Sequence, residues 1–311
     1  MRPLAAAGFL VLAACARYAD FTLPPKPGGD PSLIFRFVAQ PDPVLGRGEF
    51  QDALNPSVDG RINLYSVFDG RTWHTALAGT SDGIHWQPQG IVLSPDPRTW
   101  EGGYIAANGS LLGSMYWYQA GPRGAHRIGL ARSHGREWVK DPRPVLDHGP
   151  VGSFDERAAA DPYVIRIDPY FYMYYLGQDR AVRQRIGLAR SRDGIQWEKL
   201  RSNPVLDLDL DREAGLGEPA VWQSHGFYWM LYTVRNFDET RYLALARSTD
   251  GVRWTGLPIS YTGSESWNSK VLCDPAVQVE GETIKVWFGG GDTASPDENL
   301  HGQIGFATLV K

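Results

Sequence analysis

One pattern recurs along this chain and limits what it can fold into: an apolar strand, a tight turn and then a tryptophan. In three of the copies the strand runs into Ala-Arg-Ser, and the four tryptophans are Trp86, Trp138, Trp197 and Trp254. A fifth copy, residues 304–308, lies near the C-terminus. The steps between tryptophans are 52, 59 and 57 residues, and repeats near 50 residues that hold several short strands are typical of propeller blades. The sequence therefore predicts an all-β fold, a five-bladed β-propeller.

Each unit also carries an aromatic strand upstream of this pattern and, before that, a candidate inner strand. Four of the inner strands contain a polar residue followed by proline: Asn55-Pro56, Asp161-Pro162, Glu218-Pro219 and Asp274-Pro275. The second unit differs and offers residues 101–108 instead. We expect the blades to begin near residues 52, 101, 158, 215 and 270. The last unit has no room for an outer strand, so residues 32–39 are predicted to close blade five and remove a free sheet edge.

The features that repeat in every unit are interpreted as scaffold. Asp-Gly between two strands is first of all a turn signal, because glycine supplies a positive φ, and it occurs as Asp82-Gly83, Asp193-Gly194 and Asp250-Gly251. The repeated tryptophans are expected to fill space between blades. The repeated arginines are expected to pair between blades: Arg132, Arg190 and Arg247.

The N-terminal segment resembles a bacterial lipoprotein signal. Arg2 precedes an alanine-rich apolar run too short to span a bilayer, which ends in Leu12-Ala13-Ala14-Cys15. This predicts a signal over residues 1–15 with lipidation at Cys15, a tether over 16–32 and the propeller over 33–311. A short buried helix, or a misplaced start codon, is the alternative. Because Ala16 follows the cysteine, the expected location is the bacterial envelope, anchored in an outer membrane.

Charge and cysteine content narrow the partners. The formal net charge is −4 and no basic run is present, so nucleic acid is not an expected partner. With Cys15 lipidated, only Cys273 remains, and no intrachain disulfide is expected. No His or Cys pair has metal-ligand spacing. We therefore predict no metal, no cofactor and a monomer.

Acidic residues mark the starts of the inner strands, where a propeller's side chains converge on the central channel. They are Asp52, Glu101, Asp161, Glu218 and Asp274. Carboxylates gathered around a narrow axis repel one another, so at least one should keep its proton to higher pH. Cleavage of a glycosidic bond needs one protonated acid and one carboxylate that activates water or attacks the sugar.

At this point the chain resembles the five-bladed glycosidases of glycoside hydrolase families 43 and 32. The resemblance rests on the repeat, on Asp161-Pro162 and on the stretch Gly217-Glu218-Pro219-Ala220-Val221. It implies that Glu218 is the general acid and that Asp161 tunes and orients it. Blade one departs from the family pattern, because Asn55 stands where the resemblance implies an aspartate that acts as base. Asp52, three residues earlier, is the one candidate substitute there.

The chain also resembles family 130 mannoside phosphorylases and hydrolases, which share an Asn-Pro near blade one. A phosphorylase needs no protein base, but it does need basic residues around phosphate. Further substrate-binding candidates lie near predicted inner-strand starts or between the blade-five strands: Asn55, Trp100, Glu101, Tyr104, Trp222, Trp267, Asp274 and His301. Filling the core would explain each of the aromatic residues equally well. The alternatives are solvent exposure for Glu101, capping of a bend for Asp274 and a place in a loop for His301.

The sequence therefore predicts a glycoside hydrolase that acts on an oligo- or polysaccharide outside the cytoplasm. Two alternatives remain open. One is a carbohydrate-binding or envelope lipoprotein without catalysis, and the other is a glycoside phosphorylase.

Overall fold

The computed structural model describes residues 17–135, 137–210 and 213–311, and these form strands and one short 3₁₀ helix, η1 (Ser266–Asn268). Most strands belong to five four-stranded antiparallel units that follow one another along the chain. Unit one consists of β3 (Asp52–Asp59), β4 (Ile62–Phe68), β5 (Trp73–Thr80) and β6 (Trp86–Leu93), and unit two of β7 (Ile105–Leu112), β8 (Met115–Ala120), β9 (Arg127–His134) and β10 (Glu137–Lys140). Unit three consists of β11 (Ala158–Ile167), β12 (Tyr170–Gln178), β13 (Gln184–Ser191) and β14 (Trp197–Leu200), and unit four of β15 (Gly215–Ser224), β16 (Phe227–Arg235), β17 (Arg241–Ser248) and β18 (Thr255–Tyr261). Unit five consists of β19 (Val271–Glu280), β20 (Thr283–Gly291), β21 (Gln303–Val310) and, from the N-terminal part of the chain, β2 (Arg36–Ala39).

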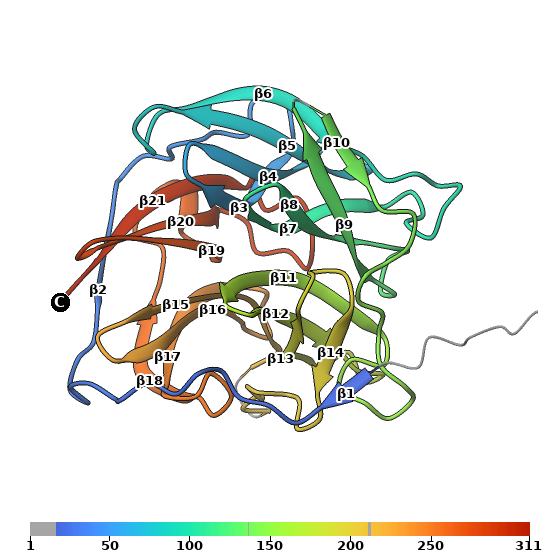
Figure 1. Ribbon diagram of the computed structural model, residues 1–311. Helices are drawn as coiled ribbons and strands as arrows, with labels where there is room; N and C mark the ends of the chain where they lie inside the picture. The colour runs from blue at the N-terminus through green and yellow to red at the C-terminus, as the bar shows by residue number, and fades with distance from the viewer. Residues whose placement is uncertain (1–16, 136, 211–212) are drawn as a thin grey trace, which may run out of the picture.

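The five units are the blades of a β-propeller, as the repeat predicts. Figure 1 shows them arranged around a common centre, with the first strand of each unit innermost. Those strands begin at residues 52, 105, 158, 215 and 271. Blade two begins a few residues later than expected, because residues 94–104 form a loop that precedes β7.

The N-terminal part of the described chain lies against three blades. In β2, Arg36 pairs with Val310 and Ala39 with Ala307 of β21, so the strand is shorter than the predicted span 32–39. Its Phe37 ring lies 5.2 Å from the Tyr261 ring. An N-terminal strand thus takes the outer place in blade five.

The predicted tether is wrong for the residues that the structure describes. β1 (Arg17–Ala19) pairs in parallel with β14 of blade three. Leu23 is fully buried, and its amide donates to the Asp250 carbonyl at 2.9 Å. The Tyr228 hydroxyl donates to the Pro24 carbonyl at 2.7 Å. An apolar side chain and backbone amides that bond to blade four hold this segment, which the prolines and glycines made look unstructured. The predicted signal and Cys15 lie outside the described residues.

The Asp-Gly turns are scaffold, as expected. Gly83, Gly194 and Gly251 have φ between 71° and 82°. Each glycine carbonyl also accepts a hydrogen bond from an aromatic side chain of the preceding blade. The donors are Trp287 Nε1 to Gly83 at 2.9 Å, Trp117 Nε1 to Gly194 at 2.8 Å, and the Tyr174 hydroxyl to Gly251 at 2.7 Å. The turns therefore join neighbouring blades.

The repeated arginines do not pair between blades. Arg132 pairs with Asp141, and Arg190 pairs with Glu198 at 3.0 Å, each within its own blade. Arg247 lies over the Phe227 ring, also within one blade. Arg132 and Arg190 each find a carboxylate within their own blade, which the repeat could not reveal. In the part of the chain that the structure describes, no helix has the length and apolar character needed to cross a bilayer.

Candidate active site

Five polar side chains, one from each inner strand, form a ring at the centre of the propeller. Each belongs to a residue in the left-handed region, with φ between 44° and 51°, and each lies at a break in the strand register: Asn55, Asn108, Asp161, Glu218 and Asp274. A residue other than glycine rarely adopts this conformation, and where it persists the surroundings impose it. A bulge turns one side chain out of the strand's alternation, and here it turns all five toward the channel.

Asn108 is the member of the ring that the sequence reasoning missed. Four ring residues are followed by proline, whereas Asn108 is followed by Gly109. A search for polar residue plus proline therefore passes over blade two. The alternative signal was its position, three residues into an inner strand that opens with the apolar run Ile105-Ala106-Ala107.

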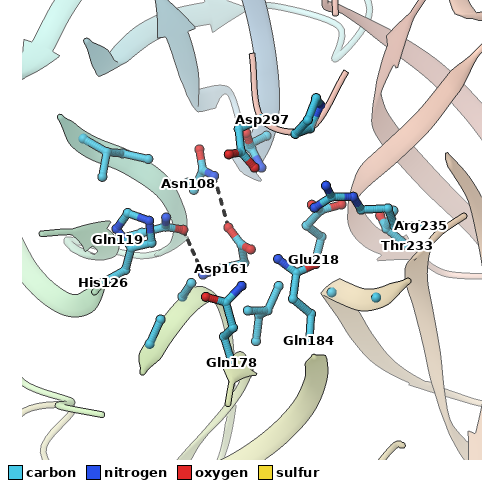
Figure 2. Close-up of a pocket in the computed structure, with 18 of the residues that line it drawn as sticks. Asn108, Gln119, His126, Asp161, Gln178, Gln184, Glu218, Thr233, Arg235 and Asp297 are labelled. Atoms are coloured by element: carbon cyan, nitrogen blue, oxygen red, sulfur yellow. Dashed lines mark hydrogen bonds between the residues drawn. The ribbon is translucent and has the colours of Figure 1, made fainter. Parts of the chain in front are cut away.

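The ring lies between two cavities. The larger, of about 310 Å³, opens at the end of the propeller where the inner strands begin. The smaller, of about 30 Å³, lies beyond the ring and has room for about one water molecule. All five ring residues line both. Figure 2 shows Asp161 near the middle of the larger cavity, with Glu218 on one side and Asn108 on another.

Side-chain amides and backbone groups hold the acids in place. Asn55 Nδ2 donates to Asp274 Oδ1 at 2.5 Å, and Asn108 Nδ2 donates to Asp161 Oδ1 at 3.1 Å. The Asp274 amide donates to Glu218 Oε2 at 3.3 Å. The three acids come from neighbouring blades, and the two amides complete the ring. Asn55 therefore has a definite role in the site, as a donor to an acid rather than as a base.

Burial changes how these acids titrate. Loss of solvent, with the nearby charge of Glu218, raises the pKa of Asp161 to about 7. The same two causes hold the pKa of Asp274 well above its usual range. The hydrogen bond from Asn108 and the charge of Arg241 oppose the rise at Asp161. The expectation that crowding would keep at least one acid protonated is therefore met by two of them.

Four arginines line the same cavity: Arg123, Arg157, Arg235 and Arg241. Arg241 opens β17 and donates to the Ser295 carbonyl at 3.0 Å and also to the Pro296 carbonyl. The charges of Glu218 and Asp274 raise its pKa, while burial opposes that rise. A guanidinium is thus fixed beside the acid ring, where it can stabilise negative charge.

Asp52, the predicted substitute for the missing base, does not lie at the cavity. It is fully buried, and its two carboxylate oxygens accept the amides of Asn299 at 2.6 Å and Gly302 at 2.8 Å. Three residues along an extended strand lead away from the ring, and the bulge lies after Asp52 rather than at it. Asp52 instead anchors the loop of residues 292–302.

That loop carries an acid that the sequence reasoning did not single out, Asp297. It lines the larger cavity, and its side chain is 48% exposed. Figure 2 shows it above Asp161, on the cavity wall formed by blade five. Glu298 beside it accepts from the Tyr104 hydroxyl at 3.0 Å and from Arg123. A loop acid has no periodic signal, so only its place in space identifies it.

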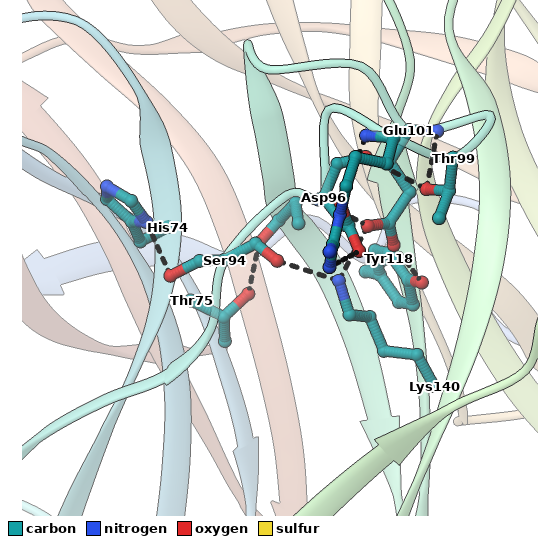
Figure 3. A network of polar contacts seen from close by, with 10 residues as sticks. His74, Thr75, Ser94, Asp96, Thr99, Glu101, Tyr118 and Lys140 are labelled. Atoms are coloured by element: carbon teal, nitrogen blue, oxygen red, sulfur yellow. Dashed lines mark hydrogen bonds and ion pairs between the residues drawn. The ribbon is translucent and has the colours of Figure 1, made fainter.

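Glu101 is not a channel residue. It is 3% exposed, and it accepts the Tyr118 hydroxyl at 2.6 Å and Lys140 Nζ at 2.6 Å. Figure 3 shows this buried network, in which the Asp96 amide also donates to Glu101. Glu101 lies in the loop before β7, four residues short of the strand. Its partners belong to blade two, so its role is structural.

Of the four aromatic candidates, one lines the cavity and three do not. Tyr104 lines the cavity, with Arg123 over its ring and His126 stacked at 6.0 Å. Three others pack away from it. Trp100 lies against Tyr118, Trp222 lies in a cluster with Phe35 and Trp229, and Trp267 stacks on Phe288 and donates to the Pro41 carbonyl. His301 is half-exposed and pairs with Asp292 at 2.7 Å, outside the cavity lining.

One group of residues brings possible metal ligands together. The donor atoms of Glu218, Cys273 and Asp274 lie within 4.8 Å of one another. Burial holds the pKa of the Cys273 thiol and of the Asp274 carboxyl well above their usual ranges. Metal ligands must lose their protons, so this set fits a proton-sharing cluster better than a metal centre.

Residues 63–288 match the model of the family described as glycosyl hydrolases family 32 N-terminal domain. Two uncharacterized Mycobacterium tuberculosis proteins are each 28% identical over 155 residues, which cover 47% of this chain. The chain spans about half, 52%, of the length of these curated relatives.

Solved structures resemble it over most of its length. One described as a glycoside hydrolase gives a TM-score of 0.69 at 19% identity, covering 93% of this protein and 92% of that one. A thermostable family-43 glycoside hydrolase gives 0.61 at 16% identity, covering 83% and 88%. A family 130 structure, from work on mannoside phosphorylases and on hydrolases of β-1,2 mannosidic linkages in Candida mannan, gives 0.63 at 16% identity, covering 91% and 96%. At these identities the likeness concerns the fold.

Proposed function

Since the chain belongs to the glycosyl hydrolase family 32 N-terminal domain family, we propose that it is a glycoside hydrolase whose reaction takes place in the larger cavity. The observation that carries the proposal is the ring of three carboxyl groups from consecutive blades, two of which hold protons at or near neutral pH. Protons held in this ring can load the neighbouring acid that departure of a sugar alcohol requires.

We assign Glu218 as the acid that protonates the leaving oxygen. Asp161 lies beside it, and with a pKa of about 7 it exchanges a proton in the range where the acid must be reloaded. Arg241 stabilises the carboxylate that forms when Glu218 gives up its proton. Asn108 fixes the Asp161 carboxyl through its 3.1 Å hydrogen bond.

The base is Asp297 rather than Asp52. Asp52 already accepts two backbone amides, whereas Asp297 makes one long contact of 3.7 Å to Arg123 and is open to solvent. Asp274 is a poor alternative, because its donor atom lies within 4.8 Å of that of Glu218. Inverting hydrolases separate their two carboxyl groups by roughly 6.5 to 9.5 Å to admit a water molecule. The proposal requires this separation between the carboxyl groups of Glu218 and Asp297.

The loop that carries Asp297 is held from three blades. Asp52 of blade one binds the amides of Asn299 and Gly302, and Tyr104 of blade two binds Glu298. Arg241 of blade four binds the carbonyls of Ser295 and Pro296. A base must be positioned as well as charged, and these contacts provide the positioning.

The acid and the base can be separated by leaving group. With aryl glycosides, Glu218→Gln should lose least activity on the most acidic phenol, since that leaving group needs no proton. Asp297→Asn should lose about 10²-fold or more on every substrate, the range that general-base groups contribute, and azide should restore turnover. The first product should carry the inverted anomeric configuration, as followed by proton NMR. Full activity of Glu218→Gln on natural glycosides would contradict the assignment.

The envelope location belongs to this proposal as well. If the N-terminal segment is a lipoprotein signal, as its residues predict, the enzyme acts on a carbohydrate outside the cytoplasm. Metabolic labelling with a fatty-acid analogue should mark the wild-type chain and leave Cys15→Ser unlabelled. Equal labelling of the two proteins would show that Cys15 is not the site of lipidation.

A further inference from the structure

One of the four cavity arginines has no acidic partner. Arg123 pairs with Glu298 and Asp297, Arg235 pairs with Glu239, and Arg241 lies next to the acid ring. Arg157, immediately before β11, is exposed and makes no ion pair among residues 17–135, 137–210 and 213–311. Its Nε donates to the Gly124 carbonyl at 2.9 Å, which fixes the side chain at the edge of the cavity.

The neighbouring His126 offers a second unused group. The Ala159 amide donates to the His126 carbonyl at 3.0 Å, so His126 lies beside the start of β11. Ala159 is two residues along the chain from Arg157. His126 lines the cavity (Figure 2), and its Nδ1 is buried without a hydrogen-bond partner among the described residues. Burial and the charge of Arg123 lower the pKa of His126 to about 4, so the ring is neutral at neutral pH.

These two groups call for different chemistry. The planar guanidinium of arginine matches a carboxylate through two parallel hydrogen bonds. A nitrogen of a neutral imidazole pairs with a hydroxyl, which can donate or accept. A buried polar atom without a partner costs free energy unless a ligand supplies one. A single ligand that carries a carboxylate and adjacent hydroxyls would satisfy both groups.

We propose that this rim of the cavity, between blades two and three, is a subsite for an acidic sugar, whose carboxylate binds Arg157 and whose hydroxyl binds the imidazole of His126. The inference rests on the proposed function and narrows it, because it names uronate-containing glycosides as the substrate class. A neutral sugar has no carboxylate to pair with the guanidinium of Arg157. Free phosphate would also satisfy Arg157, so the test includes it as a separate probe.

The test measures binding and needs no turnover. The Glu218→Gln protein is titrated at pH 7.5 with glucuronate and galacturonate, with the neutral parents glucose and galactose, and with inorganic phosphate, and binding is followed by proton NMR. At least one uronate should bind more tightly than its neutral parent. Arg157→Gln should weaken uronate binding about tenfold or more and leave neutral-sugar binding unchanged, and Arg157→Lys should recover only part of the loss.

Arg71→Gln is the matched control, because Arg71 is also exposed but lies in a turn outside the cavity. Thermal unfolding of each variant checks that the fold is intact. The proposal is overturned if no uronate is preferred, or if Arg157→Gln and Arg71→Gln behave alike. Phosphate binding that depends on Arg157, with no uronate preference, would instead favour a phosphorylase. If the wild-type protein binds uronates but hydrolyses no glycoside, the subsite proposal stands and the proposed hydrolase activity is wrong.

Discussion

At the scale of single residues, the site depends on acids that are buried before any substrate arrives. Asp161 contributes stability while it is protonated, because its pKa in the folded chain, about 7, exceeds the usual value of 3.8. That contribution is fully present below the unfolded-state pKa and is lost as the pH rises through about 7. The buried carboxyl of Asp161 therefore reduces the stability of the folded protein in neutral and alkaline solution.

Asp161→Asn should accordingly raise the unfolding temperature at pH 8, where the wild-type carboxyl must ionise in a buried place. The amide keeps an oxygen that can accept from Asn108 Nδ2. At pH 4 the difference should shrink, since the wild-type group is then protonated in the folded chain. Calorimetry at the two pH values checks this, and a variant that is equally or less stable at pH 8 would contradict the raised pKa.

Glu101 makes the opposite prediction, because its role is structural. Removing one partner of a buried ion pair costs about 3–5 kcal/mol, so Glu101→Ala should destabilise the protein by that order. The matched control is Arg98→Gln, which breaks an exposed 3.0 Å pair with Asp96 and should cost less than about 1 kcal/mol. Urea unfolding of both variants measures the difference. Similar unfolding midpoints for the two variants would mean that the contacts of Glu101 do not stabilise the folded protein.

At the scale of elements, the outermost strand of blade five is a short strand that comes from the other end of the chain. β2 has four residues and joins segments that are far apart in sequence. Phe37 faces inward, within 5.2 Å of Tyr261 and 5.3 Å of Phe288, whereas its neighbour Val38 is 44% exposed. We propose that this strand seals the ring.

Two neighbouring substitutions test that strand. Phe37→Ala should cost about 3–5 kcal/mol, as for other packed aromatic residues, and Val38→Ala less than about 1 kcal/mol, as is usual for surface changes. Size-exclusion chromatography should also show association of the Phe37 variant, because a loosened strand exposes the β21 edge. If the two variants unfold alike, β2 does not hold the ring.

The elements also show why sequence could predict some features and not others. The polar residue followed by proline in four of the repeats placed four of the five inner strands to within one residue. Asn108 was missed because glycine replaces proline after it, and Asp297 because a loop has no period. The N-terminal segment was misread as a tether, since prolines hide how Leu23 is buried against blade four. Asp52 looked like a base because sequence distance does not show which way a side chain points.

At the scale of the whole molecule, five similar blades produce one asymmetric centre. The same bulge occurs in every inner strand, but its residue is an amide in blades one and two and an acid in blades three, four and five. Repetition thus builds the scaffold, and the differences between repeats build the site. The larger cavity lies on the side of this ring that faces the loop carrying Asp297.

Hydrolysis in the central cavity is tested most directly by release of reducing ends from a panel of neutral and uronate-containing polysaccharides, by the wild type and by Glu218→Gln in phosphate-free buffer. We expect release by the wild type from at least one polymer and a loss of about 10²-fold or more in the variant. Binding of a polysaccharide without release by the wild type, or release that Glu218→Gln leaves unchanged, would contradict it.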